Sequence, residues 1–385
     1  NYNVVVGDEA GTALTTGDDN VAVGFEALST EDTGTRSVAV GYRALKVQNN
    51  DSTNYNVAVG YDAGLSITTG TQNVLIGGKT GDALTTGTDN VAIGRASLTT
   101  DDVGNKATAV GVNTLSAQNY ATSTDSYNVA MGYSAGTAVT VGLRNNLFGA
   151  FAGDSLTDAD DNVAVGDSAL NADTLGSKSV AIGRAALASQ NFTTATDSYN
   201  TAVGYNAGNA VTTGTFNTFL GGLAGDAHTT ADHNTALGLG AMSTNTQGNK
   251  NTAVGSNALS DFNVGTDTDT FNTAVGFSAG TAVTTGLKNT LIGALAGDAL
   301  TTNGLNVTDA DFNVALGRLA LSTDTLGSRS VAIGTSALRF QNFTTATDTF
   351  NTAVGHDAGS AVSTGVRNTL IGGLAGDGLT TSGGN

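Results

Sequence analysis

Acidic side chains are the densest source of chemistry in this sequence. TDADDN at 157–162 brings Asp158, Asp160 and Asp161 together, and TDADFN follows at 308–313. Carboxylate oxygens are ligands that calcium prefers, so these three aspartates are the weak candidates for a metal site. Their spacing lacks the Gly and the distal Glu of an EF-hand loop. The favoured interpretation is a solvated acidic turn, and we expect no bound metal.

Groups that could act in catalysis are scarce. The chain has no Cys and only three His, at 228, 233 and 356. No His recurs beside a Ser and an Asp, the carboxylate pairs fall in turns, and a thin repeat offers no deep pocket. The sequence therefore predicts no enzymatic activity and no cofactor.

Composition restricts the partners. The net charge is −18 with only 15 Lys and Arg, which argues against nucleic acid because phosphates require a basic surface. No apolar run approaches the ~18 residues of a membrane span. Gly occurs 53 times in 385 residues, about twice the usual ~7%, which indicates an unusual architecture.

The side chains named above belong to a short repeat. Asn-x-x-x-Gly recurs along the chain, as in NVAVG at 20–24 and NTLIG at 368–372. We call the Gly that ends this motif the marker glycine; it occurs 21 times, usually 17 residues after its predecessor. Such self-similarity predicts one continuous array over residues 1–385.

A longer period is superimposed on the short one. The residue four after the marker is Gly, Gly, Leu or Met, and Leu or Met, in strict rotation. We name these four kinds of repeat A, B, C and D. The A markers Gly60, Gly132 and Gly204 are 72 residues apart, so four repeats form a superrepeat.

Each repeat predicts one turn, or rung, of a β-solenoid. The Val and Ile before the marker favour a strand, and no 3.6-residue apolar period indicates a helix. The fold class expected is therefore all-β, a parallel β-solenoid of about 21 rungs. The small residue three after the marker predicts a second short strand. The Gly ten after it, as at Gly17 and Gly70, predicts a turn with positive φ.

Stacked rungs place the Asn residues of the motif above one another. An amide ladder of this kind satisfies buried polar groups along the axis. The expected ladder includes Asn56, Asn73, Asn90, Asn128, Asn200, Asn272 and Asn351. Thr pairs such as Thr15–Thr16 are interpreted as turn filling, with an ice-binding face as a distant alternative.

The D repeats carry long insertions with two aromatic residues each. The expected surface contacts in these loops are Tyr120, Tyr127, Phe192, Tyr199, Phe343 and Phe350. Aromatic and small polar residues suit a host-surface glycan or protein. The alternative, which we favour, is that the rings cap the coil or fill a seam between chains.

Basic residues recur twelve after the marker, as at Lys106, Lys178 and Arg329. In C repeats an acid precedes the basic residue by four or five positions, which predicts a turn-spanning ion pair; a pair between chains is the alternative. The acids concerned are Asp101 or Asp102, Asp173 and Asp324. An exposed pair of this type contributes about 0–1 kcal/mol.

Apolar residues at consecutive strand positions indicate that both faces of the strand are covered. One face can pack inside the coil, and a partner surface is needed for the other. Three chains about one axis would supply it, so we expect a homotrimer.

The motif [NS]-[VT]-A-[VI]-G-x-x-A resembles the YadA-like head repeats of trimeric autotransporter adhesins, and similar repeats occur in phage tail fibres. The resemblance covers the whole chain. It implies a left-handed parallel β-roll, a trimer, and an extracellular location on a cell surface or a virion tail. The rung is longer than the compact family repeat, and the fourfold alternation is an elaboration.

The expected role is a structural and adhesive extracellular fibre segment that presents its loops for multivalent attachment. A phage tail-fibre shaft and a self-assembling extracellular filament are alternatives. The receptor is not determined by these residues.

Overall fold

The computed structural model describes residues 2–301 and 310–381 of the chain. The chain divides into two compact units, Asn1–Ser198 and Tyr199–Asn385. The described residues of both units form strands and turns without any helix. The prediction of an all-β parallel β-solenoid with about 21 turns is confirmed.

The described residues 2–198 of the first unit contain eleven three-residue strands, one per rung. They are β1 (Val4–Val6), β2 (Val21–Val23), β3 (Val38–Val40), β4 (Val57–Val59), β5 (Val74–Ile76), β6 (Val91–Ile93), β8 (Thr108–Val110), β10 (Val129–Met131), β11 (Asn146–Phe148), β12 (Val163–Val165) and β14 (Val180–Ile182). Four two-residue strands lie in its loops: β7 (Gly104–Asn105), β9 (Thr124–Asp125), β13 (Gly176–Ser177) and β15 (Thr196–Asp197).

The second unit repeats this plan. Its three-residue strands in the described residues are β16 (Thr201–Val203), β17 (Thr218–Leu220), β18 (Thr235–Leu237), β20 (Thr252–Val254), β22 (Thr273–Val275), β23 (Thr290–Ile292), β24 (Val314–Leu316), β26 (Val331–Ile333), β28 (Thr352–Val354) and β29 (Thr369–Ile371). The two-residue strands are β19 (Gly248–Asn249), β21 (Thr268–Asp269), β25 (Gly327–Ser328) and β27 (Thr347–Asp348).

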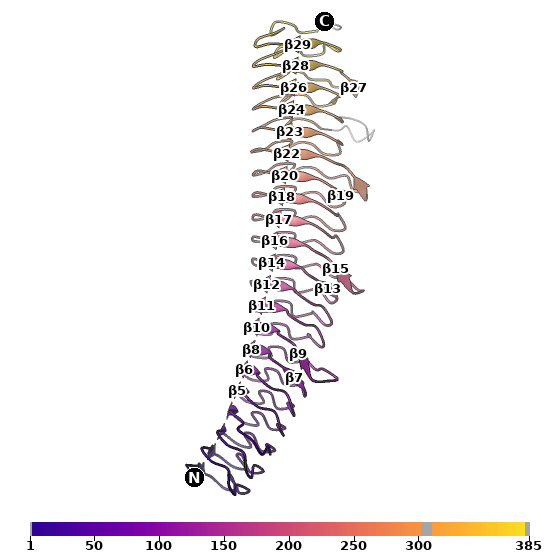
Figure 1. The fold of residues 1–385 in the computed structure, drawn as a ribbon. Coiled ribbons are helices and arrows are strands. Elements are labelled where there is room, and N and C mark those ends of the chain that lie inside the picture. Colours follow the sequence, from indigo (N-terminus) through magenta and orange to yellow (C-terminus); the bar gives the residue numbers. More distant parts are fainter. Residues whose placement is uncertain (1, 302–309, 382–385) are drawn as a thin grey trace. The chain divides into compact units, whose positions relative to one another are not determined.

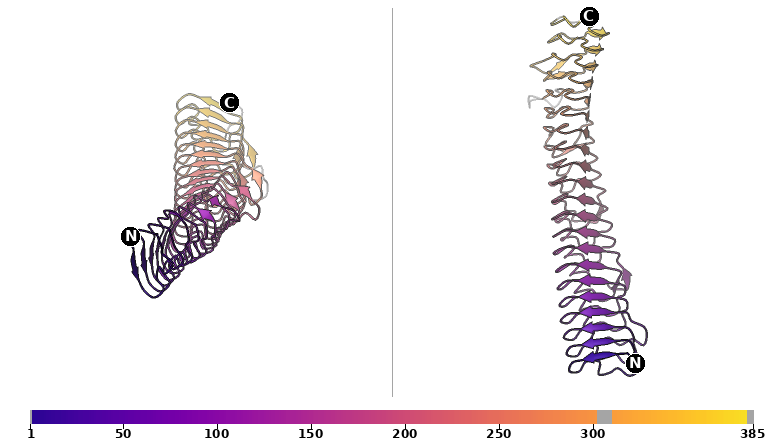
Figure 2. Two further views of the ribbon diagram at one scale, coloured as in Figure 1. Left: turned by 60° about the horizontal axis from the view of Figure 1, so that its bottom comes forward. Right: turned by 90° about the vertical axis from the view of Figure 1, so that its left-hand side faces the viewer.

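Within each unit, consecutive three-residue strands pair in parallel and without a register shift (Figure 1). Ala58 of β4 pairs with Leu75 of β5, which pairs with Ala92 of β6. The further views show the strands of each unit following one another in a single column (Figure 2). Equivalent residues of successive rungs therefore stack directly, which is the basis of every ladder described below.

The marker glycines stack with almost no space between them. Gly60 has a φ of 148°, and a Cβ there would lie 2.3 Å from the carbonyl oxygen of Gly77. A backbone of this kind is accessible to Gly alone. The repeat therefore requires Gly at this position for both conformation and space.

The Gly ten residues after the marker has a different role from the one expected. Its φ lies outside the positive region at Gly17 and Gly70, so the predicted positive-φ turn is wrong. A Cβ on Gly70 would lie 2.4 Å from the carbonyl oxygen of Gly87 in the next rung. Close stacking, and not a left-handed turn, selects Gly here.

The second strand expected after the marker is also wrong. Residues one to four after the marker form turns, which extend to the sixth residue in most repeats, and the Ala27 amide donates to the Gly24 carbonyl at 3.4 Å. Positive φ occurs in these turns at residues two and four after the marker, as at Glu26 and Leu28. The small residue itself points inward as expected, because Ala27 is fully buried.

Core volume explains why Gly and Leu alternate four residues after the marker. The middle residue of the B-repeat strand β5 is Leu75, whose methyl groups lie 2.8 Å from where a Cβ would be on Gly64 and on Gly81. C and D repeats have Ala in the strand instead, and there Leu98 and Leu115 fill the interior. Large and small residues thus exchange places between adjacent rungs, which keeps the core close-packed.

The Asn ladder links each rung to the next. The amide of Asn73 donates to Oδ1 of Asn56 at 2.9 Å, and its own Nδ2 donates to the Gly87 carbonyl at 2.9 Å. All seven predicted members, Asn56, Asn73, Asn90, Asn128, Asn200, Asn272 and Asn351, are buried. The ladder is confirmed, although most of its bonds join side chain to backbone and not amide to amide.

The ladder changes where a D repeat has no Asn. Ser330 takes the position in one D repeat, and the side chain of Gln341 replaces the missing amide. Its Nε2 donates to Ser330 Oγ at 2.8 Å, and its Oε1 accepts from Asn351 Nδ2 at 2.8 Å. The buried polar groups therefore remain paired without the Asn.

Candidate functional site

The D-repeat insertions form short loops that project from the rungs. In one loop, β9 (Thr124–Asp125) pairs in parallel with β7 (Gly104–Asn105) of the preceding rung. β13 with β15, β19 with β21, and β25 with β27 repeat this arrangement. The loops thus present similar side chains at recurring positions.

The first aromatic of each loop is not a surface contact. Tyr120, Phe192 and Phe343 retain only 4–6% exposure, so their prediction as surface residues is wrong. The Tyr120 hydroxyl donates to the Gly142 carbonyl in the next rung at 2.8 Å. Burial raises the pKa of this hydroxyl well above its usual value. These rings close the interior under the loop, which is the capping role considered above.

The second aromatic of each loop is half-exposed. Tyr127, Tyr199 and Phe350 expose 48–52% of their surface. Lys106 Nζ lies 5.3 Å from the centre of the Tyr127 ring, which is a cation–π contact. This prediction of exposed aromatic residues is confirmed, whereas their role in binding stays a prediction.

The ion pairs of these loops join rungs. Lys106 Nζ lies 2.6 Å from Asp125 Oδ2, and this hydrogen bond raises the pKa of the lysine and lowers that of the aspartate. The equivalent pairs are Lys178–Asp197, Lys250–Asp269 and Arg329–Asp348. The predicted pairs with the acid four or five residues earlier are wrong, because the basic residues contact these later acids. Asp101, Asp173 and Asp324 instead accept a hydrogen bond from a glutamine side chain.

The acidic cluster at 157–162 is held by an arginine. Arg144 Nε lies 2.5 Å from Asp161 Oδ1, and its Nη2 lies 3.6 Å from Asp160 Oδ2. The Arg144 hydrogen bond lowers the pKa of Asp161. Asp158 is exposed beside them. In the described part of the chain no three acidic, His or Cys side chains form a group that could hold a metal ion.

A buried polar cluster, which the sequence did not predict, lies at the interior position seven residues after the marker. In four C repeats this position holds an acid, and all four acids are almost fully buried: Glu31, Asp101, Asp173 and Asp324. Asp101 Oδ1 accepts from the Gly104 amide at 2.9 Å, and its Oδ2 accepts from Gln118 Nε2 at 2.7 Å. Burial raises the pKa of Asp101 and of Asp324. A comparison of the four kinds of repeat, each aligned separately, would have revealed this position.

Three successive rungs carry a different cluster at the same position. The C repeat has Asn245 in place of the acid, and the D repeat after it has Phe262 in place of the glutamine. The B repeat before it has His228, where the other B repeats have leucine. Asn245 Nδ2 donates to the Gly248 carbonyl at 2.8 Å and lies 3.1 Å from His228 Nε2. Burial lowers the pKa of His228 to about 3, so the ring is neutral. The neutral cluster contains no buried charge.

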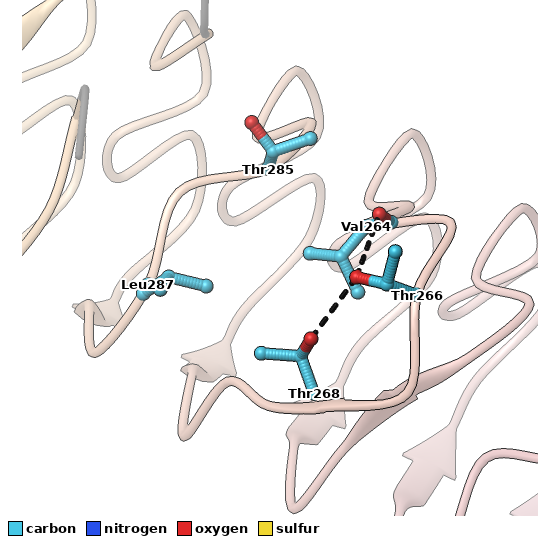
Figure 3. Close-up of a pocket in the computed structure, with 5 residues that line it drawn as sticks. All are labelled: Val264, Thr266, Thr268, Thr285 and Leu287. Atoms are coloured by element: carbon cyan, nitrogen blue, oxygen red, sulfur yellow. Dashed lines mark hydrogen bonds between the residues drawn. The ribbon is translucent and has the colours of Figure 1, made fainter. Parts of the chain in front are cut away.

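The loop that follows Phe262 also contains a pocket (Figure 3). Three loop residues line it, with two residues of the next rung: Val264, Thr266, Thr268, Thr285 and Leu287. Thr266 Oγ1 lies 3.0 Å from Thr268 Oγ1, and it donates to the Val264 carbonyl at 3.5 Å. The pocket wall therefore combines apolar side chains with hydroxyl groups.

The threonines at the turns are bonded along the axis. Thr68 Oγ1 donates to the Thr85 carbonyl at 3.2 Å, and Thr85 Oγ1 donates to the Asp102 carbonyl at 3.0 Å. These hydroxyls stabilise the contact between rungs, in agreement with turn filling.

The described residues contain no helix that is long and apolar enough to cross a membrane. Comparison with known proteins found neither a family model nor a curated protein that matches this chain.

Proposed function

We propose that this chain is a structural and adhesive segment of an extracellular fibre, which presents its D-repeat loops for multivalent attachment. The recurrence of one exposed cluster, formed by a basic residue, an aspartate and an aromatic residue, carries the proposal. The cluster of Lys106, Asp125 and Tyr127 has its counterpart in that of Lys250, Asp269 and Phe271. Weak contacts to identical loops add through effective concentration.

Cohesion between rungs supports a structural role. Backbone pairs, the Asn ladder and the Thr hydroxyls all run from one rung to the next. A solenoid of this type gains its stability from interfaces between neighbouring repeats. These bonds resist separation of the rungs, which suits a segment that holds an attachment surface at a distance.

The outer face of the strands supports a homotrimer. From β2 onward, the middle residue of each described three-residue strand is buried, whereas its neighbours remain partly exposed, as in β10, where Met131 is 46% exposed. Because the strands stack in register, these residues form apolar columns, such as Val59, Ile76 and Ile93. Three chains packed through such columns would remove them from water. The resemblance to YadA-like head repeats, with its left-handed coil, agrees with this arrangement.

The proposal is tested with the purified chain in two steps. Light scattering is expected to give about three times the 38.1 kDa of one chain, and a monomer that is well folded contradicts the trimer.

Beads coated with the chain are then offered to host cells and extracellular matrix. Replacing Tyr127, Tyr199, Phe271 and Phe350 together by Ser is expected to reduce retention at least tenfold, because the four long D loops then lose their exposed rings. The control variant replaces Thr68 and Thr85 by Ser. Both are half-buried, and their hydroxyls bond to the next rung and not to a D loop. Equal retention of both variants, or none by the parent chain, contradicts the adhesive role.

A further inference from the structure

We infer that the pocket beside Val264 is a binding site for a phenol ring, such as the side chain of tyrosine. The pocket lies within the second unit and is formed by one loop and the rung that follows it (Figure 3). The inference goes beyond the proposed adhesive role and does not depend on it.

The other long D loops show what fills this position. Tyr120, Phe192 and Phe343 each lie nine residues after the marker, and each ring is almost fully buried. Val264 has the same position in its loop, but it has no ring and is only half-buried. Three sister loops therefore supply an aromatic ring from the chain itself, whereas this loop does not.

The wall of the pocket coincides with the ring site of Tyr120. The Tyr120 hydroxyl donates to the carbonyl of Gly142, ten residues after the marker of the next rung. Gly286 is the equivalent residue beside Val264, and its neighbours Thr285 and Leu287 line the pocket. The pocket thus opens at the place where the tyrosine ring lies in the sister loop.

A hydrogen-bond acceptor for the phenol is also present. The Gly142 carbonyl accepts from both Tyr120 and Asn128 Nδ2, the second bond being 2.7 Å long. Among the described residues, the Gly286 carbonyl accepts only from Asn272 Nδ2, at 2.8 Å. A carbonyl oxygen has two lone pairs, so one remains for a hydroxyl group. A phenol therefore matches the pocket both in its position relative to the Tyr120 ring and in its polarity.

The test uses p-cresol, the side chain of tyrosine as a free molecule, titrated into the full chain. Calorimetry or ligand-detected NMR is expected to show one site per chain. Binding should be about fivefold weaker for 4-methylanisole, whose oxygen cannot donate a hydrogen bond. N-acetyl-tyrosinamide distinguishes the sources: binding as tight as that of p-cresol indicates a tyrosine residue, and weaker binding indicates a small free phenol.

Two variants make the assignment specific. Val264→Tyr supplies the ring internally and should abolish p-cresol binding while raising the melting temperature. Phe192→Val empties the equivalent position of another loop, so it should increase the stoichiometry from one site to two. The inference is overturned if the parent chain does not bind p-cresol, if Val264→Tyr binds it equally well, or if Phe192→Val is folded by circular dichroism but gains no site.

Discussion

At the interior position seven residues after the marker, one series of rungs carries Leu84, Asp101 and Gln118. Another series carries His228, Asn245 and Phe262 at the equivalent positions. The first buries a carboxylate with an amide donor 2.7 Å away. The second buries an imidazole with an amide 3.1 Å away. The same backbone thus accommodates a cluster built on a buried acid and one without any acid.

The difference extends to the Asn ladder. Where Gln341 is present, the ladder position holds Ser330. The glutamine side chain then donates to Ser330 and accepts from Asn351, in place of the missing Asn. Where Phe262 is present, Asn251 restores the ladder, and its Oδ1 accepts from the amide of Asn272 at 2.9 Å. An apolar ring cannot replace the missing amide, so the substitutions must occur together. We therefore expect these four positions to behave as one coupled group.

The largest effect is expected when the two clusters are mixed. Gln118→Phe removes the donor to Asp101 Oδ2 and leaves a buried carboxylate oxygen unpaired. We expect the free energy of local opening to fall by about 3 kcal/mol. Hydrogen exchange of the Gly104 amide, which donates to Asp101, measures this change directly.

The matching control transplants the whole neutral group. Leu84→His, Asp101→Asn and Ala107→Asn are combined with Gln118→Phe, which reproduces the residues found around Asn245. This quadruple variant is expected to recover more than half of the stability lost by Gln118→Phe. If the two variants open equally easily at Gly104, the four positions are not coupled.

The second prediction concerns pH, to which the two clusters respond in opposite directions. His228 has a pKa lowered from 6.5 to about 3, so the unfolded state binds more protons in this window, and stability falls as pH decreases below 6.5. The loss is about 1.4 kcal/mol per pH unit, or about 2 kcal/mol between pH 6.5 and 5. The folded-state pKa of Asp101 is raised above 3.8, so its contribution to stability is greatest below 3.8 and decreases as pH rises through the raised pKa.

Hydrogen exchange of the Gly248 and Gly104 amides, corrected for the intrinsic effect of pH, compares the two clusters in one sample. The Gly248 amide donates to Asn245 Oδ1 at 2.9 Å and reports on the neutral cluster. Slopes of the same sign at both glycines would show that local burial does not control these titrations.

The smallest effect is expected from replacing His228 at neutral pH. Its Nδ1 is buried without a partner in the described structure, which is an energetic cost. His228→Leu restores the residue of the other B repeats and leaves Asn245 its bond to the Gly248 carbonyl. We expect a gain of about 1 kcal/mol at pH 7, measured by urea unfolding, and loss of the acid sensitivity at Gly248. A clear destabilisation would show that the bond between His228 and Asn245 contributes more than the unpaired nitrogen costs.

The fold was predictable from the sequence because its strongest signals repeat in every rung. The marker glycine recurs in every kind of repeat and the ladder Asn in every A, B and C repeat, so their stacking followed directly from the 17-residue period. The role of Gly70 did not follow, since close approach to another rung and positive φ both select Gly. The φ of Gly70 and the position of the Gly87 carbonyl distinguish these two causes.

The candidate site was only partly predictable. Tyr120 and Tyr127 lie in the same polar loop, and nothing in the loop sequence indicates that the first ring reaches the Gly142 carbonyl of the next rung. The role of Asp101 was hidden because its position holds a different residue type in each kind of repeat. The true partner of Lys106 is Asp125, nineteen residues later, and stacking brings these residues closer than their sequence separation suggests.

Coupling between a C repeat and the D repeat that follows it has a consequence for how the gene can change. Loss of a single rung would set a buried acid such as Asp324 against a neighbour without an amide donor. Recombination between segments that begin at equivalent markers, such as Gly132 and Gly204, instead removes or adds 72 residues and preserves every contact between rungs. Length variants that fold are therefore expected to differ by whole blocks of four rungs.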